Sequence, residues 1–221
     1  MASALTLIGS AKFRPLRNIW LLEELGVPYK HVPATPRSAQ TYEAGNPFGK
    51  VPALTDGTFS MYESAAINTY LSDKFRCRPG VADLVPEAGT PLRGRYEQLV
   101  QTISMELDAQ GLWIHRKHEA LAGMLAPAAP DAVAHARTHV SKVVGILATE
   151  LVNGRGEYLL GDFGFSAVDC LFVHCLNWSE SIGWADWASA VSSQGEQYEA
   201  LRAYAARCRA RPAYIKAKAA P

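Results

Sequence analysis

Two dipeptides flank a short hairpin and carry the chemistry to hold a small, charged peptide. Val51-Pro52 comes directly before one apolar run, and Glu63-Ser64 follows the next. Proline cannot donate to a strand ladder, so Pro52 suits an edge or a turn better than a central strand. Asp56-Gly57 lies between the two runs and is a strong hairpin signal. A hairpin would bring both dipeptides close together, so we expect this stretch to bind such a peptide.

Ser64 stands where the spacing of apolar residues changes to that of a helix. Ile67, Leu71 and Phe75 fall on one helical face. The first N–H groups of a helix are unpaired and its dipole is positive there, so a carboxylate is a suitable ligand. The alternatives are that Glu63-Ser64 is a plain N-cap and that Pro52 only forms a turn.

The elements around these dipeptides follow the order β-α-β-α-β-β-α. Short apolar runs bounded by turn residues predict the strands, and apolar residues at helical spacing predict the helices. The strands are expected at residues 5–9, 29–32, 53–55 and 59–62, and the helices at 14–26, 35–46 and 63–75.

The rest of the chain is expected to be helical. Residues 78–91 are rich in proline and glycine and predict a linker between a domain at 1–77 and an all-α domain at 92–221. Ser166 and Asp169 have the spacing of a capping box, with Asp in place of the usual Glu or Gln. Long helices are predicted at 92–122, 131–152, 167–178 and 195–210, and a short one after Arg211-Pro212.

Composition excludes several classes of protein. The chain has 221 residues, with 22 Lys and Arg against 21 Asp and Glu, so it lacks the basic bias of a nucleic-acid binder. No stretch is long and apolar enough for a membrane span, and the start has no charged segment typical of a signal peptide. The four cysteines form no CxxC pair, and His135 and His139 lack a third ligand nearby. We expect a cytoplasmic protein without a metal.

Five segments together resemble cytosolic glutathione transferases, in particular a bacterial-type, serine-like or theta-like branch. The resemblance covers nearly the whole chain, and the combination is specific although no single segment is. It implies a thioredoxin-like N-terminal domain and an all-helical C-terminal domain. The segments are LRNIWLLEELGVPY at 16–29, NPFGKVPAL at 46–54, ESAAI at 63–67, GDFGFSAVDC at 161–170 and LRAYAARCRARPAY at 201–214.

The resemblance implies which residues hold glutathione. A cis peptide bond at Val51-Pro52 would turn the Val51 backbone toward the cysteinyl unit, which could pair with it like an added strand. Ser64 would hold the γ-glutamyl carboxylate at the helix N-terminus, and Glu63 would face the ammonium group. Lys50 would face the glycyl carboxylate, although a solvated surface lysine is the alternative.

The residue that activates the thiol is not obvious. Serine-type relatives carry a serine four residues before the arginine that matches Arg17, and this position is Phe13 here. Ser10, in the loop after the first strand, is our first choice as the catalytic hydroxyl. Lys12 or the backbone N–H of Phe13 are the alternatives, and Arg14 would add a positive field.

The expected activity is transfer of the glutathione thiolate to a small hydrophobic electrophile by a homodimer without a metal. The resemblance places the electrophile over the start of the first helix, and the residues expected to line its pocket are Phe13, Met105, Asp108, Trp113 and His115. Core packing is the alternative for Met105 and Trp113. Alternative functions are glutathione-dependent isomerisation, dehalogenation or peroxide reduction, and non-catalytic ligand binding, which Phe13 favours.

Overall fold

A computed structural model describes residues 5–154, 156–185 and 195–221. The first four residues, on which the expectation about a signal peptide partly depends, lie outside this part. The chain forms two compact units: one comprises the chain up to Pro86 together with Cys208–Pro221, and the other comprises Glu87–Arg207. The predicted boundaries at 77 and 91 remain a prediction. The segment Cys208–Pro221, however, is part of the same compact unit as the N-terminal residues.

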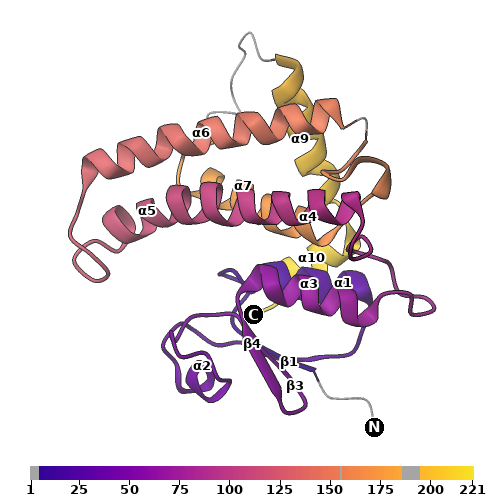
Figure 1. The fold of residues 1–221 in the computed structure, drawn as a ribbon. Helices are drawn as coiled ribbons and strands as arrows, with labels where there is room; N and C mark the ends of the chain where they lie inside the picture. Colours follow the sequence, from indigo (N-terminus) through magenta and orange to yellow (C-terminus); the bar gives the residue numbers. More distant parts are fainter. Residues whose placement is uncertain (1–4, 155, 186–194) are drawn as a thin grey trace. The chain divides into compact units, whose positions relative to one another are not determined.

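The N-terminal unit has a thioredoxin-like fold, with the predicted order β-α-β-α-β-β-α. The strands form one sheet, in which Figure 1 labels β1, β3 and β4. Their order is β2-β1-β3-β4, with β2 parallel to β1 and the other neighbours antiparallel. The elements are β1 (Leu5–Ile8), α1 (Leu16–Leu25), β2 (Lys30–Val32), α2 (Ala39–Glu43), β3 (Ala53–Asp56), β4 (Phe59–Tyr62) and α3 (Ser64–Phe75).

The β3–β4 hairpin confirms the turn predicted from Asp-Gly. Asp56 pairs with Phe59 at the closed end, and Gly57 has a φ of 62°, which a glycine adopts without a steric penalty. Ala53 pairs with Tyr62 at the open end. Pro52 directly precedes Ala53, and Glu63 directly follows Tyr62. The hairpin therefore brings the two dipeptides to the same end of the sheet.

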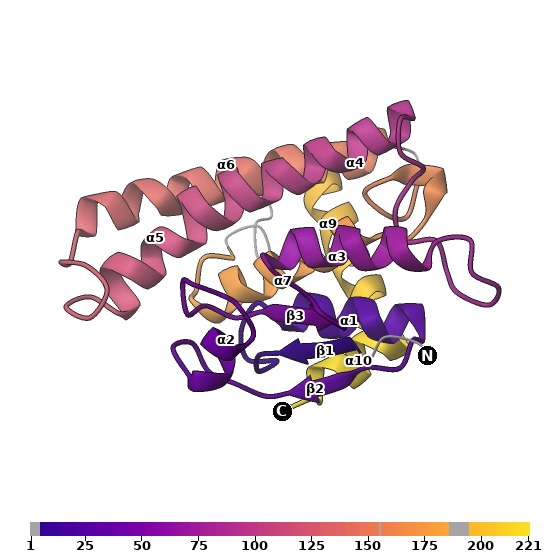
Figure 2. The same cartoon turned by 60° about the horizontal axis from the view of Figure 1, so that its bottom comes forward.

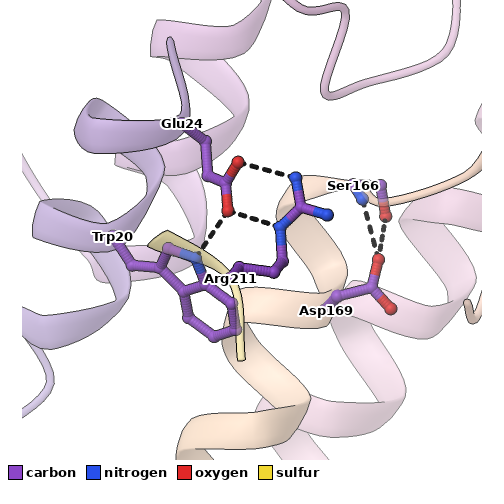
Figure 3. A network of polar contacts seen from close by, with 5 residues as sticks. All are labelled: Trp20, Glu24, Ser166, Asp169 and Arg211. Carbon is purple, nitrogen blue, oxygen red and sulfur yellow. Dashed lines mark hydrogen bonds and ion pairs between the residues drawn. The ribbon is translucent and has the colours of Figure 1, made fainter. Parts of the chain in front are cut away.

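The last helix of the chain, α10 (Pro212–Lys218), packs along α1 within the N-terminal unit (Figure 2). The Trp20 and Tyr214 rings meet edge to face, with centroids 4.8 Å apart. Arg211 donates from Nε and Nη2 to the two carboxylate oxygens of Glu24, at 2.6 and 2.7 Å (Figure 3). Trp20 is almost completely buried, so α10 completes the core of this unit.

The second unit is helical, as expected, but its first long helix is not a regular α-helix. The segments η1 and η2 have π-helical hydrogen bonding, which has more residues per turn than an α-helix. None of the described helices is both long and apolar enough to cross a membrane. The elements are α4 (Pro91–Thr102), η1 (Ile103–Leu112), α5 (Trp113–His115), η2 (Arg116–Ala120), α6 (Pro130–Asn153), the 3₁₀ turn η3 (Gly161–Phe163), α7 (Ala167–Ser181) and α9 (Gly195–Arg209).

The predicted capping box at the start of α7 is present (Figure 3). The Asp169 carboxylate accepts hydrogen bonds from the Ser166 N–H at 2.8 Å and the Ser166 hydroxyl at 2.9 Å. It also accepts from the Leu159 N–H at 3.2 Å and from the Tyr204 hydroxyl at 2.8 Å. Burial raises the pKa of Asp169, and these four donors oppose that shift.

Candidate functional site

The loop that follows β1 is held against the segment that contains the proline dipeptide. Gly9 has a φ of 135°, and a Cβ atom there would lie 2.4 Å from Pro15 Cγ and 2.9 Å from Val51 Cβ. Both separations are closer than side chains tolerate, so this position accepts only glycine without rearrangement. The close approach brings the Ser10 loop next to Val51.

Ser10, the predicted catalytic residue, lies directly after Gly9 and is 8% exposed. Its N–H donates to the Ala34 carbonyl at 2.9 Å, and its hydroxyl oxygen accepts the Lys12 N–H at 3.3 Å. The second contact fits the alternative of a serine that stabilises the loop. It uses the oxygen as an acceptor, however, so the hydroxyl proton stays available for a thiolate.

Phe13 follows in the same loop and starts a turn that leads into α1. Its N–H donates to the Ser10 carbonyl at 3.2 Å. The backbone N–H of Phe13, an alternative thiol-activating donor, is therefore engaged within the loop. The neighbouring Lys12 side chain is exposed and Arg14 is half-buried.

The Val51-Pro52 peptide bond is cis, as the resemblance implied. Val51 itself is buried to 7% exposure. Its main chain makes no hydrogen bond with another of the described residues. A buried backbone N–H or C=O is usually paired, so an extended peptide is a suitable partner for this short edge.

Ser64 is the first residue of α3, directly after the N-cap position. Glu63 occupies the N-cap position and makes no side-chain capping bond. The Ser64 hydroxyl instead accepts a hydrogen bond from Arg17 Nη1 at 3.1 Å, and both side chains are buried. A buried guanidinium beside a helix N-terminus makes this end of α3 favourable for an anion.

The flanking charged residues have more exposed positions. Glu63 is exposed and has a positive φ of 72°, which a non-glycine residue seldom adopts. Such backbone outliers cluster at functional sites. Lys50 is exposed, its carbonyl accepts from Asn46 Nδ2 at 2.7 Å, and its ammonium lies 5.9 Å from the centre of the Phe48 ring.

Sequence reasoning missed the polar residues behind Ser64. Asn18 Nδ2 donates to the Ser64 carbonyl at 2.8 Å and to Asn68 Oδ1 at 2.6 Å. Asn68 Nδ2 donates in turn to the Arg17 carbonyl at 3.2 Å. Two asparagines, Asn18 and Asn68, at positions where α1 and α3 otherwise present apolar side chains were the signal that could have revealed this network.

The residues predicted to line the electrophile pocket are divided between the two units. Phe13 lies in the N-terminal unit, whereas the other four lie on consecutive segments η1 and α5 of the second unit. His115 is 8% exposed, and its ring meets Trp184 edge to face at 5.1 Å. Asp108 is buried and Met105 is 52% exposed. A pocket that combines Phe13 with these residues stays a prediction.

The two histidines considered as metal ligands do not gather a ligand set. His139 Nε2 lies 3.1 Å from a carboxylate oxygen of Glu106, and His135 is exposed. Among the described residues, no group of three or more histidine, cysteine or acidic side chains could hold a metal ion.

Residues 17–79 match the family model described as the N-terminal domain of glutathione S-transferase. Glutathione S-transferase F10 of Arabidopsis thaliana is 30% identical over 125 residues, which are 55% of this chain and 54% of that protein. Glutathione S-transferase 3 of Zea mays is 30% identical over 154 residues, 66% of this chain and 65% of that protein. These matches show that the chain is similar to glutathione S-transferases over more than half of its length.

The solved structures agree with this at the level of the fold. The structure of Ure2p in complex with glutathione has a TM-score of 0.77 and 19% identity, and the match covers 99% of this chain and 94% of Ure2p. The sequence match to F10 spans only about half of that glutathione S-transferase. These distant relatives do not distinguish a branch of the glutathione S-transferase family.

Proposed function

We propose that this chain binds glutathione on its N-terminal unit and is a glutathione transferase. The observation that carries the proposal is the start of α3. There an uncapped helix N-terminus, the Ser64 hydroxyl and the buried Arg17 guanidinium come together, with the hydrogen bond between the last two at 3.1 Å. This set of donors suits the γ-glutamyl carboxylate of glutathione.

With the γ-glutamyl carboxylate bound at the start of α3, the other groups of the tripeptide meet the following residues. The Val51 main chain pairs with the cysteinyl unit, because both of its backbone groups are available to an added strand. Glu63 faces the ligand's ammonium group, and Lys50 faces its glycyl carboxylate. The fit depends on main-chain groups and charges and requires no metal ligand.

The Ser10 loop supplies the reactive end of the site. A thiol with a pKa near ~8.5 is only about 3% ionised at pH 7, so transfer requires preferential stabilisation of the thiolate. The Ser10 hydroxyl donates a hydrogen bond to the thiolate, and the charges of Lys12 and Arg14 add a positive field. The sulfur then forms a bond to an electrophilic carbon, and a leaving group departs with the bonding electrons or the electrophile takes them up.

The electrophile that the resemblance implies is a small hydrophobic molecule. We also propose, from the resemblance, a cytoplasmic homodimer of the bacterial-type, serine-like or theta-like branch with a role in detoxification. Isomerisation, dehalogenation and peroxide reduction use the same bound thiolate and remain alternatives.

A second candidate function is glutathione-dependent ligand binding without catalysis. Phe13 favours this function, because its side chain cannot donate and its N–H is engaged by the Ser10 carbonyl. The two candidates share the glutathione site and differ only in the ionisation of the bound thiol.

Isothermal titration with glutathione, followed by ultraviolet titration of the bound thiol, tests both candidates. A thiol pKa lowered by about 2 units in the complex supports the transferase, because most of the bound thiol is then ionised at pH 7. An unshifted thiol pKa supports the carrier. Ser10→Ala should return the pKa toward that of free glutathione, with Ser38→Ala, on the loop before α2, as a control. Absence of glutathione binding rules out both candidates.

A further inference from the structure

Two fully buried asparagines cross-link the first turns of α1 and α3. Asn18 lies in the first turn of α1 and Asn68 lies one turn into α3, and both side chains are 0% exposed. Their amides meet at 2.6 Å, from Asn18 Nδ2 to Asn68 Oδ1. Amides are seldom buried so deeply where apolar side chains would fit, so this asparagine pair calls for an explanation.

Each asparagine also binds the main chain of the opposite helix. Asn18 Nδ2 reaches from α1 to the Ser64 carbonyl at 2.8 Å, and Asn68 Nδ2 reaches from α3 to the Arg17 carbonyl at 3.2 Å. A helix carbonyl has a second lone pair, so these contacts do not compete with the helical hydrogen bonds. The asparagine pair therefore fixes the two helix starts to each other through both backbones.

The arrangement is not optimal for stability alone. The Asn18 Oδ1 atom is buried and has no hydrogen-bond partner among the described residues. An unsatisfied buried acceptor is destabilising, whereas replacement of both members of a buried polar pair by apolar residues is often neutral or stabilising. Stability alone therefore does not explain why two amides are buried here.

The two helix starts are also the two ends of the proposed glutathione site. The loop with Ser10 leads into α1, and Ser64 begins α3. A shift of Ser64 would move the first-turn amides of α3 and the hydroxyl that Arg17 holds. Small errors of position in such a donor set greatly weaken binding of an anion, because these hydrogen bonds depend on direction.

We infer that Asn18 and Asn68 are positioning residues. They hold the first-turn amides of α3 and the Ser64 hydroxyl where these groups can bind the γ-glutamyl carboxylate of glutathione. This inference rests on the proposed glutathione site. The asparagines touch no ligand atom themselves. They act on one end of the tripeptide, so their removal should weaken the contact with that carboxylate and leave the rest of the peptide's contacts intact.

The experiment compares glutathione with γ-aminobutyryl-cysteinylglycine, which lacks only the α-carboxylate of the glutamyl unit. Dissociation constants are measured by calorimetry for the wild-type protein and for the double variant Asn18→Leu/Asn68→Leu, which replaces both amides by side chains of similar size. Ser72→Ala is the matched control. It removes a buried hydroxyl from the same helix, where Ser72 Oγ donates to the Asn68 carbonyl at 2.8 Å, and it leaves both amide side chains in place.

The double variant should bind glutathione about tenfold more weakly, the effect of losing roughly one good hydrogen bond. Its affinity for the analogue should stay within about twofold of that of the wild type. The ratio of the dissociation constant for the analogue to that for glutathione should therefore be smaller in the double variant than in the wild type. Ser72→Ala should bind both ligands as the wild type does. A double variant that binds glutathione with the wild-type constant, or that loses both ligands equally, overturns the inference.

Thermal unfolding followed by circular dichroism establishes whether the double variant folds. If it does not, Asn18→Leu alone decides by the same criterion, because it removes the Ser64 contact and leaves Asn68 bound to the Arg17 carbonyl. Lack of glutathione binding by the wild-type protein refutes the proposed function itself, and that outcome is distinct from an unchanged ratio of the two constants.

Discussion

Arg211 holds the Glu24 carboxylate with two parallel hydrogen bonds of 2.6 and 2.7 Å. Trp20 Nε1 donates to the same carboxylate at 2.9 Å. The Glu24 side chain is 9% exposed and that of Arg211 is 28% exposed. The two residues are far apart in the sequence, and their contact fastens the end of the chain to its first helix.

We expect Arg211→Ala to lower the free energy of unfolding by about 1 to 3 kcal/mol, because it removes the charged donor from a nearly buried carboxylate and leaves the hydrogen bond from the Trp20 indole. The free energy of unfolding of Arg211→Lys should lie between those of the wild type and Arg211→Ala, since lysine keeps the charge but not the paired geometry. Urea unfolding measures both. The control is Arg95→Ala, which breaks the more exposed pair with Glu150 and should cost at most about 1 kcal/mol. Equal losses at the two sites would contradict this prediction.

Asp56 should make stability depend on pH in the acid range. Its burial acts to raise the pKa, but the hydrogen bonds from Lys74 and Tyr70 outweigh this and lower the pKa of Asp56 below its ordinary value. A lowered pKa in the folded state contributes stability above the unfolded pKa of about 3.9, and this is lost as the pH falls through the folded pKa. Asp56→Asn should be less stable than wild type at pH 7, with a difference that narrows below about pH 4.

The measurement is the free energy of unfolding of both proteins between pH 7 and pH 2.5. Glu43→Gln, which changes an exposed carboxylate on α2, is the control and should follow the wild-type curve. A gap between wild type and Asp56→Asn that widens toward low pH would have the wrong sign.

Tyr204→Phe should destabilise the second unit by about 1.5 to 3 kcal/mol, the usual contribution of a hydrogen bond to a charged group. The change removes the donor 2.8 Å from Asp169 and keeps the aromatic ring, which packs on Phe172. Asp169→Asn should cost more, because it weakens contacts with four donors at once. Thermal unfolding followed by circular dichroism ranks the two variants, and the reverse order would contradict the role of Asp169 as the acceptor shared by the four donors.

Replacement by alanine should lower the stability at Gly9 and raise it at Gly94. Gly9→Ala should destabilise the N-terminal unit by about 1 to 3 kcal/mol, because the new Cβ would overlap Pro15 and Val51. Gly94, inside α4 with open space around it, should gain about 0.5 to 1 kcal/mol from the same change. Calorimetric melting temperatures test the pair. If Gly9→Ala also raised the melting temperature, the close approach of the loop to Val51 would be disproved.

Elements with strong local signals could be predicted from the sequence. The β3–β4 hairpin followed from Asp56-Gly57, and α7 followed from Ser166, Asp169 and the apolar residues after them. Both predictions depend on contacts between residues close together in the chain, for which local rules hold well. The cis bond at Val51-Pro52 came from the family resemblance and not from the spacing of residues.

Features that depend on distant contacts could not be predicted in this way. The phase of the helix at 92–122 assumed 3.6 residues per turn, but the π-helical hydrogen bonds of η1 and η2 change the direction of every later side chain. The directions predicted for Trp113 and His115 depended on that assumption. Asn18 and Asn68 were not identified from the sequence, because an asparagine inside a helix usually indicates only a solvent-exposed position.

The return of α10 to α1 has a consequence for synthesis of the protein. On the ribosome, Trp20 emerges long before Tyr214, its ring partner 4.8 Å away in the finished molecule. Part of the core of the N-terminal unit thus stays exposed while more than half of the polypeptide is still to be translated. A fragment that stops at residue 86 should tend to aggregate, and an α10 peptide added in trans should rescue its solubility.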